Sequence, residues 1–331
     1  MLLTAVLLAG CGGGGDSSTQ SSETISKTPE TRRNVNVALD TWRNPETVAF
    51  PMAKKFKYFQ NLDLEIRTYS PVSPIVAIPD VLNGTDEFGV SHEPQVVMAK
   101  AKGAPIVILG SLVQKPTAAL IWLKKSHIKS IADLKGKTIA IPGLPFQKSL
   151  LEKVLAQGGL TLNDVKVMSA GNDLVTDLAG GRADATFGGS GNIEGVELEA
   201  RGLNPVITPV GDSGVPGYNE LVVIARADLV SKEPQFVRDF MSAVVRGSAK
   251  SIEDPTAALN SIEGGAERNP ETSRKEMEAQ VEATVPLLSK DGYVSPGQAR
   301  GLVDWMYEEG MIQRKVPVAA LLTNRYLPAA P

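Results

Sequence analysis

A glycine-rich turn over residues 187–195, with the sequence FGGSGNIEG, carries two polar side chains, Asn192 and Glu194. It follows the apolar run 183–187 and leads into a helix-like pattern. Glycine lets the backbone approach a ligand closely, and the first turn of a helix offers unpaired N–H groups. An amide and a carboxyl group at the end of a buried element cost free energy unless they are hydrogen-bonded. This turn is therefore a candidate binding site for a small polar ligand, with an ordinary glycine turn as the alternative.

A second turn of the same kind, residues 214–220 with the sequence GVPGYNE, ends in Tyr218, Asn219 and Glu220. It leads directly into the apolar strand expected at 221–225. One such turn has an ordinary structural explanation, but two that both end in a carboxyl group favour a shared binding site. We expect Tyr218 and Glu220 to contribute to it.

Further candidates follow expected strands nearer the N-terminus. One polar turn holds Asp40, Trp42 and Asn44, and another holds His92 and Glu93. In a parallel sheet, ligands bind at the carboxyl ends of the strands, where these turns meet. Aromatic rings there can stack on a flat ligand, while carboxyl and amide groups hydrogen-bond its edge.

Each of these side chains also has a structural alternative. Trp42 could pack in the core, and Glu220 could make an ion pair between lobes or a hinge contact. His92 could be a loop residue with satisfied hydrogen bonds. Glu93 could stabilise the start of the next helix, because a carboxylate there interacts well with the helix dipole.

Strands alternate with helices through most of the chain, which predicts an α/β fold with mostly parallel sheets. The expected strands lie near 35–39, 64–69, 88–90, 106–111, 118–124, 138–140, 165–168, 183–187 and 221–225; the expected helices lie near 46–56, 74–82, 96–101, 146–157, 234–251, 255–262, 274–284 and 296–309.

Composition excludes several classes of function. The 331 residues carry a net charge of −3 with acidic and basic residues interspersed, so no basic stripe suggests nucleic-acid binding. Two histidines and one cysteine exclude most zinc sites and any intrachain disulfide. No Ser/His/Asp or Cys/His catalytic grouping can be assembled with any force, and the GKT at 136–138 lacks the first glycine of a phosphate-binding loop. We expect no catalytic residues, metal or cofactor.

The N-terminus predicts an anchor. Residues 1–10 form an apolar run too short to span a membrane, and the sequence Leu-Ala-Gly-Cys ends at Cys11. This resembles the lipobox of bacterial lipoproteins, in which the cysteine becomes lipidated. The segment 11–33 is rich in Gly, Ser and Thr, as is typical of a flexible tether. Because no basic residues precede the apolar run, we expect the natural start to lie upstream.

The phrase ADLKGKTIA at 132–140 resembles the opening of the second lobe in bacterial solute-binding proteins of the type II periplasmic fold. That resemblance implies two lobes joined by a two-strand hinge at 114–117 and 214–218. Lobe 1 would comprise 34–113 and 219–331, and lobe 2 would comprise 114–218.

The sequences of four turns point to one family within this class of binding proteins. The sequences DTWRNP, SHEPQ, GGSGNIEG and GVPGYNELV resemble motifs of the lipoproteins that bind thiamine pyrimidine precursors (formylaminopyrimidine or hydroxymethylpyrimidine) for ABC import; they begin at 40, 91, 188 and 214. The family often has aromatic residues where this chain has Ser190 and Gly191, and Tyr where it has His92.

This resemblance implies a monomeric, extracytoplasmic, lipid-anchored protein that delivers an aminopyrimidine to a permease and its ATPase. It implies stacking by Trp42 and Tyr218 and hydrogen bonds to the ligand from Asn44, Asn192 and Glu194. The alternatives are the same transport role for riboflavin, a sulfonate or nitrate, and, in another class, an enzyme like the fungal pyrimidine-precursor synthase. That synthase shares the fold and consumes its own histidine and pyridoxal phosphate, but its cysteine-rich stretch has no counterpart here.

Overall fold

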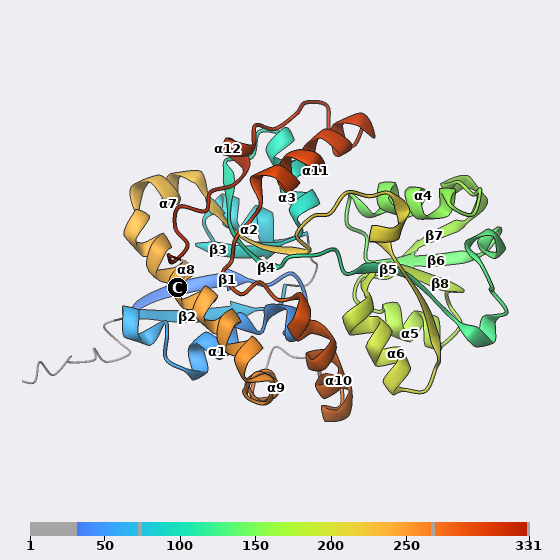
Figure 1. The fold of residues 1–331 in the computed structure, drawn as a ribbon, viewed down its shortest axis with the longest axis horizontal. Coiled ribbons are helices and arrows are strands. Elements are labelled where there is room, and N and C mark those ends of the chain that lie inside the picture. The colour runs from blue at the N-terminus through green and yellow to red at the C-terminus, as the bar shows by residue number, and fades with distance from the viewer. Residues whose placement is uncertain (1–31, 72–74, 266–268, 330–331) are drawn as a thin grey trace, which may run out of the picture.

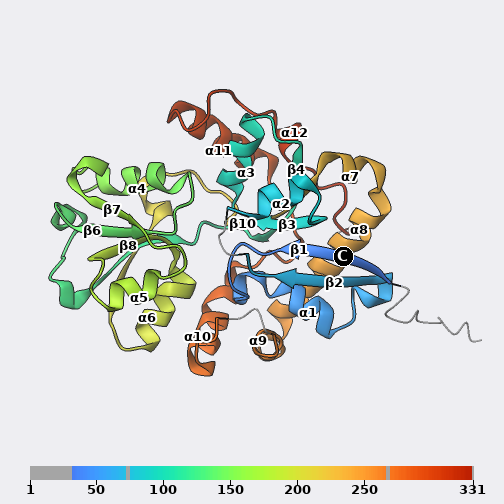
Figure 2. The same ribbon diagram turned by 180° about the vertical axis from the view of Figure 1, so that it is seen from behind.

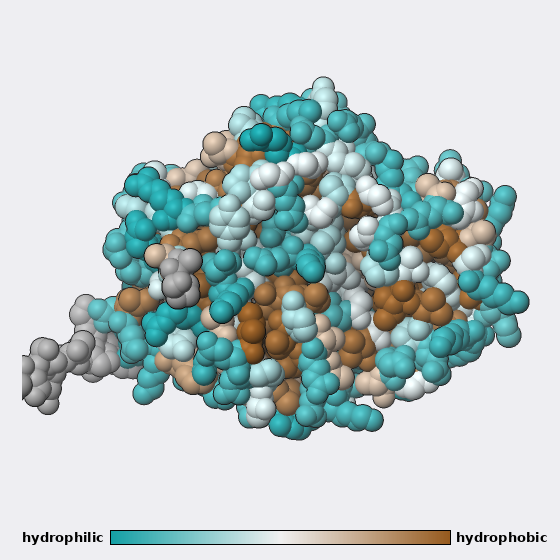
Figure 3. All heavy atoms as spheres, in the orientation of Figure 1, coloured by the Kyte–Doolittle hydropathy of each residue, from teal (hydrophilic) through white to brown (hydrophobic). Residues whose placement is uncertain are grey.

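The computed structural model describes residues 32–71, 75–265 and 269–329. Two five-stranded sheets, each flanked by helices, form two lobes that lie side by side (Figures 1 and 2). The strand order is β2-β1-β3-β10-β4 in the first sheet and β7-β6-β8-β5-β9 in the second. Hydrophilic side chains cover most of the face in Figure 3, with apolar patches on both lobes. Among the described residues, no helix has the length and apolar character needed to cross a bilayer.

The strands are β1 (Arg33–Ala38), β2 (Leu64–Tyr69), β3 (Phe88–Ser91), β4 (Ile106–Val113), β5 (Ala118–Leu123), β6 (Thr138–Ile141), β7 (Lys166–Ser169), β8 (Ala185–Ser190), β9 (Pro205–Pro209) and β10 (Leu221–Arg226). The helices are α1 (Ala49–Lys55), α2 (Ala77–Asn83), α3 (Glu93–Ala101), α4 (Gln147–Ala156), α5 (Leu174–Ala179), α6 (Val196–Ala200), α7 (Ala227–Lys232), α8 (Pro234–Glu253), α9 (Pro255–Glu263), α10 (Arg274–Thr284), α11 (Pro296–Glu308) and α12 (Val318–Leu321).

Both sheets are mixed and follow the same plan. In the first, β1 pairs in parallel with β2 and β3, while β10 pairs antiparallel with β3 and β4. In the second, β6 pairs in parallel with β7 and β8, while β5 pairs antiparallel with β8 and β9. Parallel pairings thus make up half of each sheet rather than most of it. The reason is that β5 and β10, the strands that enter each lobe from the other, run against their neighbours.

The core of the first lobe depends on a close approach of α8 to α1. A Cβ atom on Gly247 of α8 would lie 2.1 Å from the Ala49 carbonyl oxygen, so only glycine lets the two backbones come this near. The rings of Phe88 and Phe240 stack face to face, with their centroids 3.7 Å apart. These apolar contacts hold the start of β3, the strand that leads to the polar turn at His92.

Two segments, 114–117 and 210–220, connect the two sheets. The lobes also touch through α10, which comes from the C-terminal part of the chain and packs against α6 of the second lobe (Figure 1). Arg201 Nε donates to Glu276 Oε1 at 2.9 Å across this contact. The C-terminal helices therefore contact both lobes.

Some elements differ from the sequence prediction. Strand β9 was not expected, because prolines stand at both of its ends; it is an edge strand, where proline is tolerated. The helix expected at 46–56 is a short 3₁₀ turn, Pro45–Thr47, followed by α1. Cys11, the signal segment 1–10 and residues 11–31 of the tether lie outside the described residues; Arg33, at the end of the tether, already belongs to β1.

Candidate functional site

A cavity of about 530 Å³ lies between the lobes. Its first wall is the turn after β1 together with His92, which follows β3. Its second wall is the end of β8 and the loop that leads into α5, and the start of α10 closes one side. The lining residues include Asp40, Trp42, Asn44, Glu46 and His92 from the first lobe and Leu174, Gly189, Ser190, Glu194 and Glu197 from the second.

The turn after β1 presents carboxyl groups from a rigid base. Asn44 Oδ1 accepts the Glu46 N–H at 2.7 Å and thereby caps the 3₁₀ turn that starts at Pro45. This cap fixes the backbone of Glu46, whose side chain is 4% exposed, as is that of Asp40. One oxygen of Asp40, Oδ1, is buried and has no hydrogen-bond partner among the described residues.

The environment makes both carboxyl groups hard to ionise. Burial, followed by the charges of Glu220 and Asp40, raises the pKa of Glu46 to about 8. Burial also raises the pKa of Asp40, although His92 and the nearby backbone N–H groups act in the opposite direction. At neutral pH Glu46 is therefore mainly a neutral acid, able to donate a hydrogen bond.

On the opposite wall, β8 ends in a π-helical turn, Gly191–Gly195, that carries Glu194. Glu194 Oε2 accepts the Ser190 N–H at 2.6 Å, so the carboxyl group folds back over the turn. Burial raises its pKa to about 7, against the lowering effect of the local backbone N–H groups. A Cβ atom on Gly189 would lie 2.7 Å from Leu174 Cδ1 and 3.1 Å from the Glu194 carboxyl group. The glycine here makes room for Glu194 itself.

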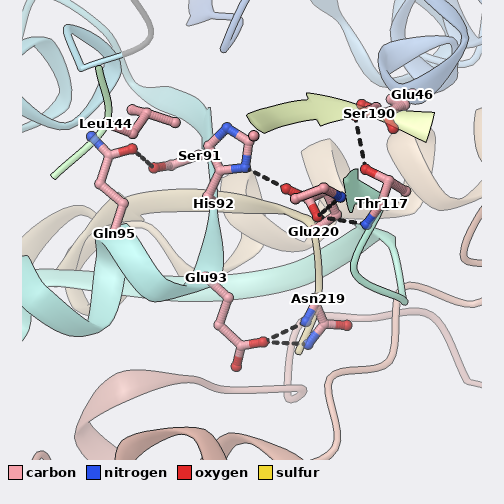
Figure 4. A network of polar contacts seen from close by, with 12 residues as sticks. Glu46, Ser91, His92, Glu93, Gln95, Thr117, Leu144, Ser190, Asn219 and Glu220 are labelled. Carbon is pink, nitrogen blue, oxygen red and sulfur yellow. Dashed lines mark hydrogen bonds and ion pairs between the residues drawn. The ribbon is translucent and has the colours of Figure 1, made fainter. Parts of the chain in front are cut away.

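The buried Glu220 and the partly buried His92 form a pair where the segments between the lobes meet (Figure 4). Glu220 Oε1 lies 2.9 Å from His92 Nδ1, and Oε2 accepts the Thr117 N–H at 2.7 Å and the Ala118 N–H at 3.3 Å. Burial disfavours the charged form of both groups, but the hydrogen bond and charge interaction between them are stronger. The pKa of His92 is therefore raised and that of Glu220 is lowered. Glu220 therefore performs the hinge role that was its structural alternative, and it does not line the cavity.

Glu93 and Tyr218 also lie away from the cavity wall. Glu93 is fully buried in the first turn of α3, where its Oε2 accepts the Asn219 N–H at 2.7 Å and Asn219 Nδ2 at 2.8 Å (Figure 4). Tyr218 is 0% exposed and packs within the main apolar cluster, so its ring cannot stack on a ligand in the cavity. Neither residue lies where it was expected to contact a ligand. Each side chain instead holds the segment before β10 in place.

Asn192 connects the lobes instead of facing the cavity. Its Nδ2 donates to Glu46 Oε1 at 3.1 Å and to Thr284 Oγ1 at 2.8 Å. Because Glu46 lines the cavity, Asn192 influences the cavity indirectly, by holding one oxygen of the Glu46 carboxyl group.

Trp42 lies on the cavity wall with 40% of its surface exposed, so it is not a core residue. Of the nine candidate ligand contacts, five line the cavity: Asp40, Trp42, Asn44, His92 and Glu194. Sequence reasoning missed Glu46 and Glu197, which also line it. A signal for Glu46 was present, because a carboxyl residue follows Asn-Pro directly after the polar turn, but Glu46 was assigned only to the start of the expected helix.

The cavity wall is acidic. Of its basic side chains, His92 is paired with Glu220, and Arg43 donates to Thr68 Oγ1 at 3.3 Å. Glu197 is paired with Arg201 at 2.6 Å. Such a wall suits a flat molecule that carries amino donors and a basic nitrogen, and it disfavours anions. No group of three His, Cys, Asp or Glu side chains placed to hold a metal occurs in the described part of the chain.

Comparisons with known proteins agree on a family and a fold. The NMT1/THI5-like family model matches residues 44–258. The formylaminopyrimidine-binding protein of Halalkalibacterium halodurans is 29% identical over 265 residues, covering 78% of this chain and 76% of that protein. The 4-amino-5-hydroxymethyl-2-methylpyrimidine phosphate synthase of Legionella pneumophila subsp. pneumophila is 25% identical over 303 residues, covering 91% and 94%.

The solved structure of the alkanesulfonate-binding protein SsuA from Xanthomonas axonopodis pv. citri aligns with a TM-score of 0.68 at 17% identity, over 88% of this chain and 98% of that one. At this identity the likeness concerns the fold. The two-lobed periplasmic-binding-protein architecture expected from the sequence is confirmed.

Proposed function

Because the chain belongs to the NMT1/THI5-like family, we propose that it is an extracytoplasmic solute-binding protein whose ligand is a thiamine-related aminopyrimidine. The observation that carries this proposal is the acidic cavity between two lobes, with one exposed tryptophan on its wall. The similarity to the formylaminopyrimidine-binding protein supports the same ligand class.

Each part of an aminopyrimidine finds a complementary group in this cavity. The indole of Trp42 would stack on one face of the ring. Glu194 would accept a hydrogen bond from the exocyclic amino group, and Asp40 offers an oxygen that has no partner among the described residues. Asn44 would contribute little directly, because its Oδ1 already caps the 3₁₀ turn.

Delivery to an ABC permease and its ATPase is the second part of the proposal. We assign Cys11 as the lipid attachment site and residues 11–33 as the tether, which would hold the protein at the outer face of the cell membrane. Lobe 1 (34–113 and 219–331) and lobe 2 (114–218) would close on the ligand by rotation about the two connecting segments.

A synthase is the candidate from another class, and the relative from Legionella pneumophila favours it. Two observations oppose it. The chain contains one cysteine, at position 11, and so lacks the cysteine-rich stretch of the fungal enzymes. In addition, the phosphate of a phosphorylated product would face Glu46, Glu194 and Glu197, and no lysine lies among the described residues that line the cavity. We therefore propose that the chain is not an enzyme.

Sulfonate and nitrate are disfavoured for the same electrostatic reason. Riboflavin is neutral and flat, and it is the stronger rival because Ser190 lines the cavity where the family often has an aromatic residue.

Mass spectrometry of the small molecules that co-purify with the full chain tests the proposal. A thermal-shift panel of 4-amino-5-hydroxymethyl-2-methylpyrimidine, its phosphate ester, riboflavin and a sulfonate should accompany it. We expect the unphosphorylated pyrimidine alone to raise the melting temperature, because a ligand at a hundredfold excess over its dissociation constant stabilises the fold by about 2.7 kcal/mol. Stabilisation by the phosphate ester would favour the synthase. Stabilisation by riboflavin would mean that the ligand is a flavin, while the proposed transport role would stand.

A further inference from the structure

Three carboxyl groups of the cavity, those of Asp40, Glu46 and Glu194, lie close enough for their charges to act on one another. Glu46 is influenced by Asp40, Glu194 and Glu220, and Glu194 is influenced by Asp40 and Glu197. Groups of like charge in a buried site cannot all ionise at neutral pH. The cavity therefore retains a proton that an exposed cluster of the same residues would lose.

The neighbouring cations do not neutralise this cluster. His92 faces Asp40 and Glu46, but its Nδ1 lies 2.9 Å from Glu220 Oε1, and this contact raises the pKa of His92 and lowers that of Glu220. Arg201 is engaged by Glu197 and Glu276. The guanidinium of Arg43 lies against Gly265 and donates to Thr68.

Glu46 is the group best placed to hold the proton. Burial and its acidic neighbours raise its pKa to about 8, compared with about 7 for Glu194, whereas Asp40 has His92 and backbone N–H groups beside it that favour its charged form. Its Oε1 accepts from Asn192 Nδ2, so the proton belongs on the other oxygen of the same carboxyl group. The buried Oδ1 of Asp40, which has no partner within the described chain, marks a place on this wall where a donor is missing.

We propose that the bound ligand shares one proton with the protein. This proton lies between the carboxyl group of Glu46 and a basic ring nitrogen of the ligand. The inference rests on the proposed function, since it needs a ligand with such a nitrogen. The proton is already on Glu46 in the empty cavity, and on binding it lies between the Glu46 oxygen and the ring nitrogen, so none is gained or lost at neutral pH. The cavity thus selects bases over neutral rings of the same shape.

Calorimetric titration of the full chain with 4-amino-5-hydroxymethyl-2-methylpyrimidine, between about pH 6 and pH 9, tests the inference. Above about pH 8 Glu46 has lost its proton, so each binding event must take one up. The affinity should then fall about tenfold per pH unit, and paired buffers of different ionisation enthalpy should report the uptake of about one proton per ligand. The matched probe (2-amino-4-methylphenyl)methanol has the same shape without ring nitrogens, and its weaker affinity should not depend on pH in this range.

Variants locate the proton. Glu46→Gln should abolish the fall in affinity above about pH 8, whereas Asp40→Asn should move it to lower pH by removing a charge that raises the pKa of Glu46. Asp212→Asn, at an exposed position outside the cavity, should leave the profile unchanged.

Three results would overturn the inference. Pyrimidine affinity that is constant above about pH 8 would leave the proposed function intact but remove the shared proton. A fall that persists in Glu46→Gln would assign the titration to His92, whose pKa is also raised. Absence of pyrimidine binding at every pH would reject both proposals together.

Discussion

The buried carboxyl groups at the hinge and those in the cavity are of two kinds. At the hinge, Glu220 has partners for both of its oxygens: His92, Thr117 and Ala118. In the cavity, Asp40 has a buried oxygen with no partner among the described residues, and Glu46 has its pKa raised to about 8. Burial is equal in the two places, so burial alone does not identify a binding residue. Hydrogen bonding distinguishes Glu220 from Asp40, and it identifies a binding residue only together with a place on the cavity wall, because Asp86, Glu93 and Asp177 also have an oxygen without a partner in the described chain but lie outside the cavity.

The largest expected effect is on the hinge. Glu220→Ala should lower the free energy of unfolding by about 3–5 kcal/mol, because it leaves the largely buried His92 and two N–H groups without their acceptor. Asp40→Asn, at an equally buried position in the cavity, should leave stability unchanged or raise it, since it relieves an uncompensated carboxyl group. Urea unfolding of both variants measures this, and equal losses would remove the distinction between the two kinds of acid.

The pH dependence of stability should follow the cavity acids. Glu46 ionises near pH 4.5 when unfolded and near pH 8 when folded, so the unfolded state loses its proton first. The stabilisation from the protonated group is fully present below about pH 4.5 and is lost as the pH rises to about 8, with a slope of up to about 1.4 kcal/mol per pH unit. Glu46→Gln should remove this contribution in urea titrations at about pH 5, 6 and 7. His92 contributes a loss in the same direction, since its pKa is also raised, and that part should remain in the variant.

Ligand affinity should depend on Glu194 more than on Glu197, although both line the cavity. Above about pH 7, where Glu194 is ionised, Glu194→Gln should weaken binding of 4-amino-5-hydroxymethyl-2-methylpyrimidine by about 1–3 kcal/mol, because a charged acceptor for the amino group is replaced by a neutral one. Glu197→Gln is the matched control, with a smaller expected effect, since its carboxyl group already pairs with Arg201. Equal losses in calorimetry would mean that the overall negative charge matters and that the position of Glu194 does not.

The sequence predicted the family and the two-lobed fold, and both are confirmed. Periodic apolar residues show which elements form, and strand ends place Asp40 and His92 near each other. Sequence could not separate Glu220 and Tyr218 from true cavity residues, because whether a polar group after a strand points inward depends on the crossing of the two connecting segments. The π-helical turn that holds Glu194 was equally hidden, since its hydrogen bonding depends on packing against β5 and β9.

The smallest effect is expected for Trp42, the exposed aromatic residue on the cavity wall. Trp42 is 40% exposed, so Trp42→Ala should leave the free energy of unfolding within about 0.5 kcal/mol of the wild type. It should still weaken pyrimidine binding by about 1 kcal/mol, or roughly fivefold, because a stacking face is lost. Tyr307→Ala, at a similarly exposed aromatic outside the cavity, should change neither quantity. If Trp42→Ala left affinity unchanged, recognition would rest on the carboxyl groups alone, and the contrast between hinge and cavity acids would then account for the whole site.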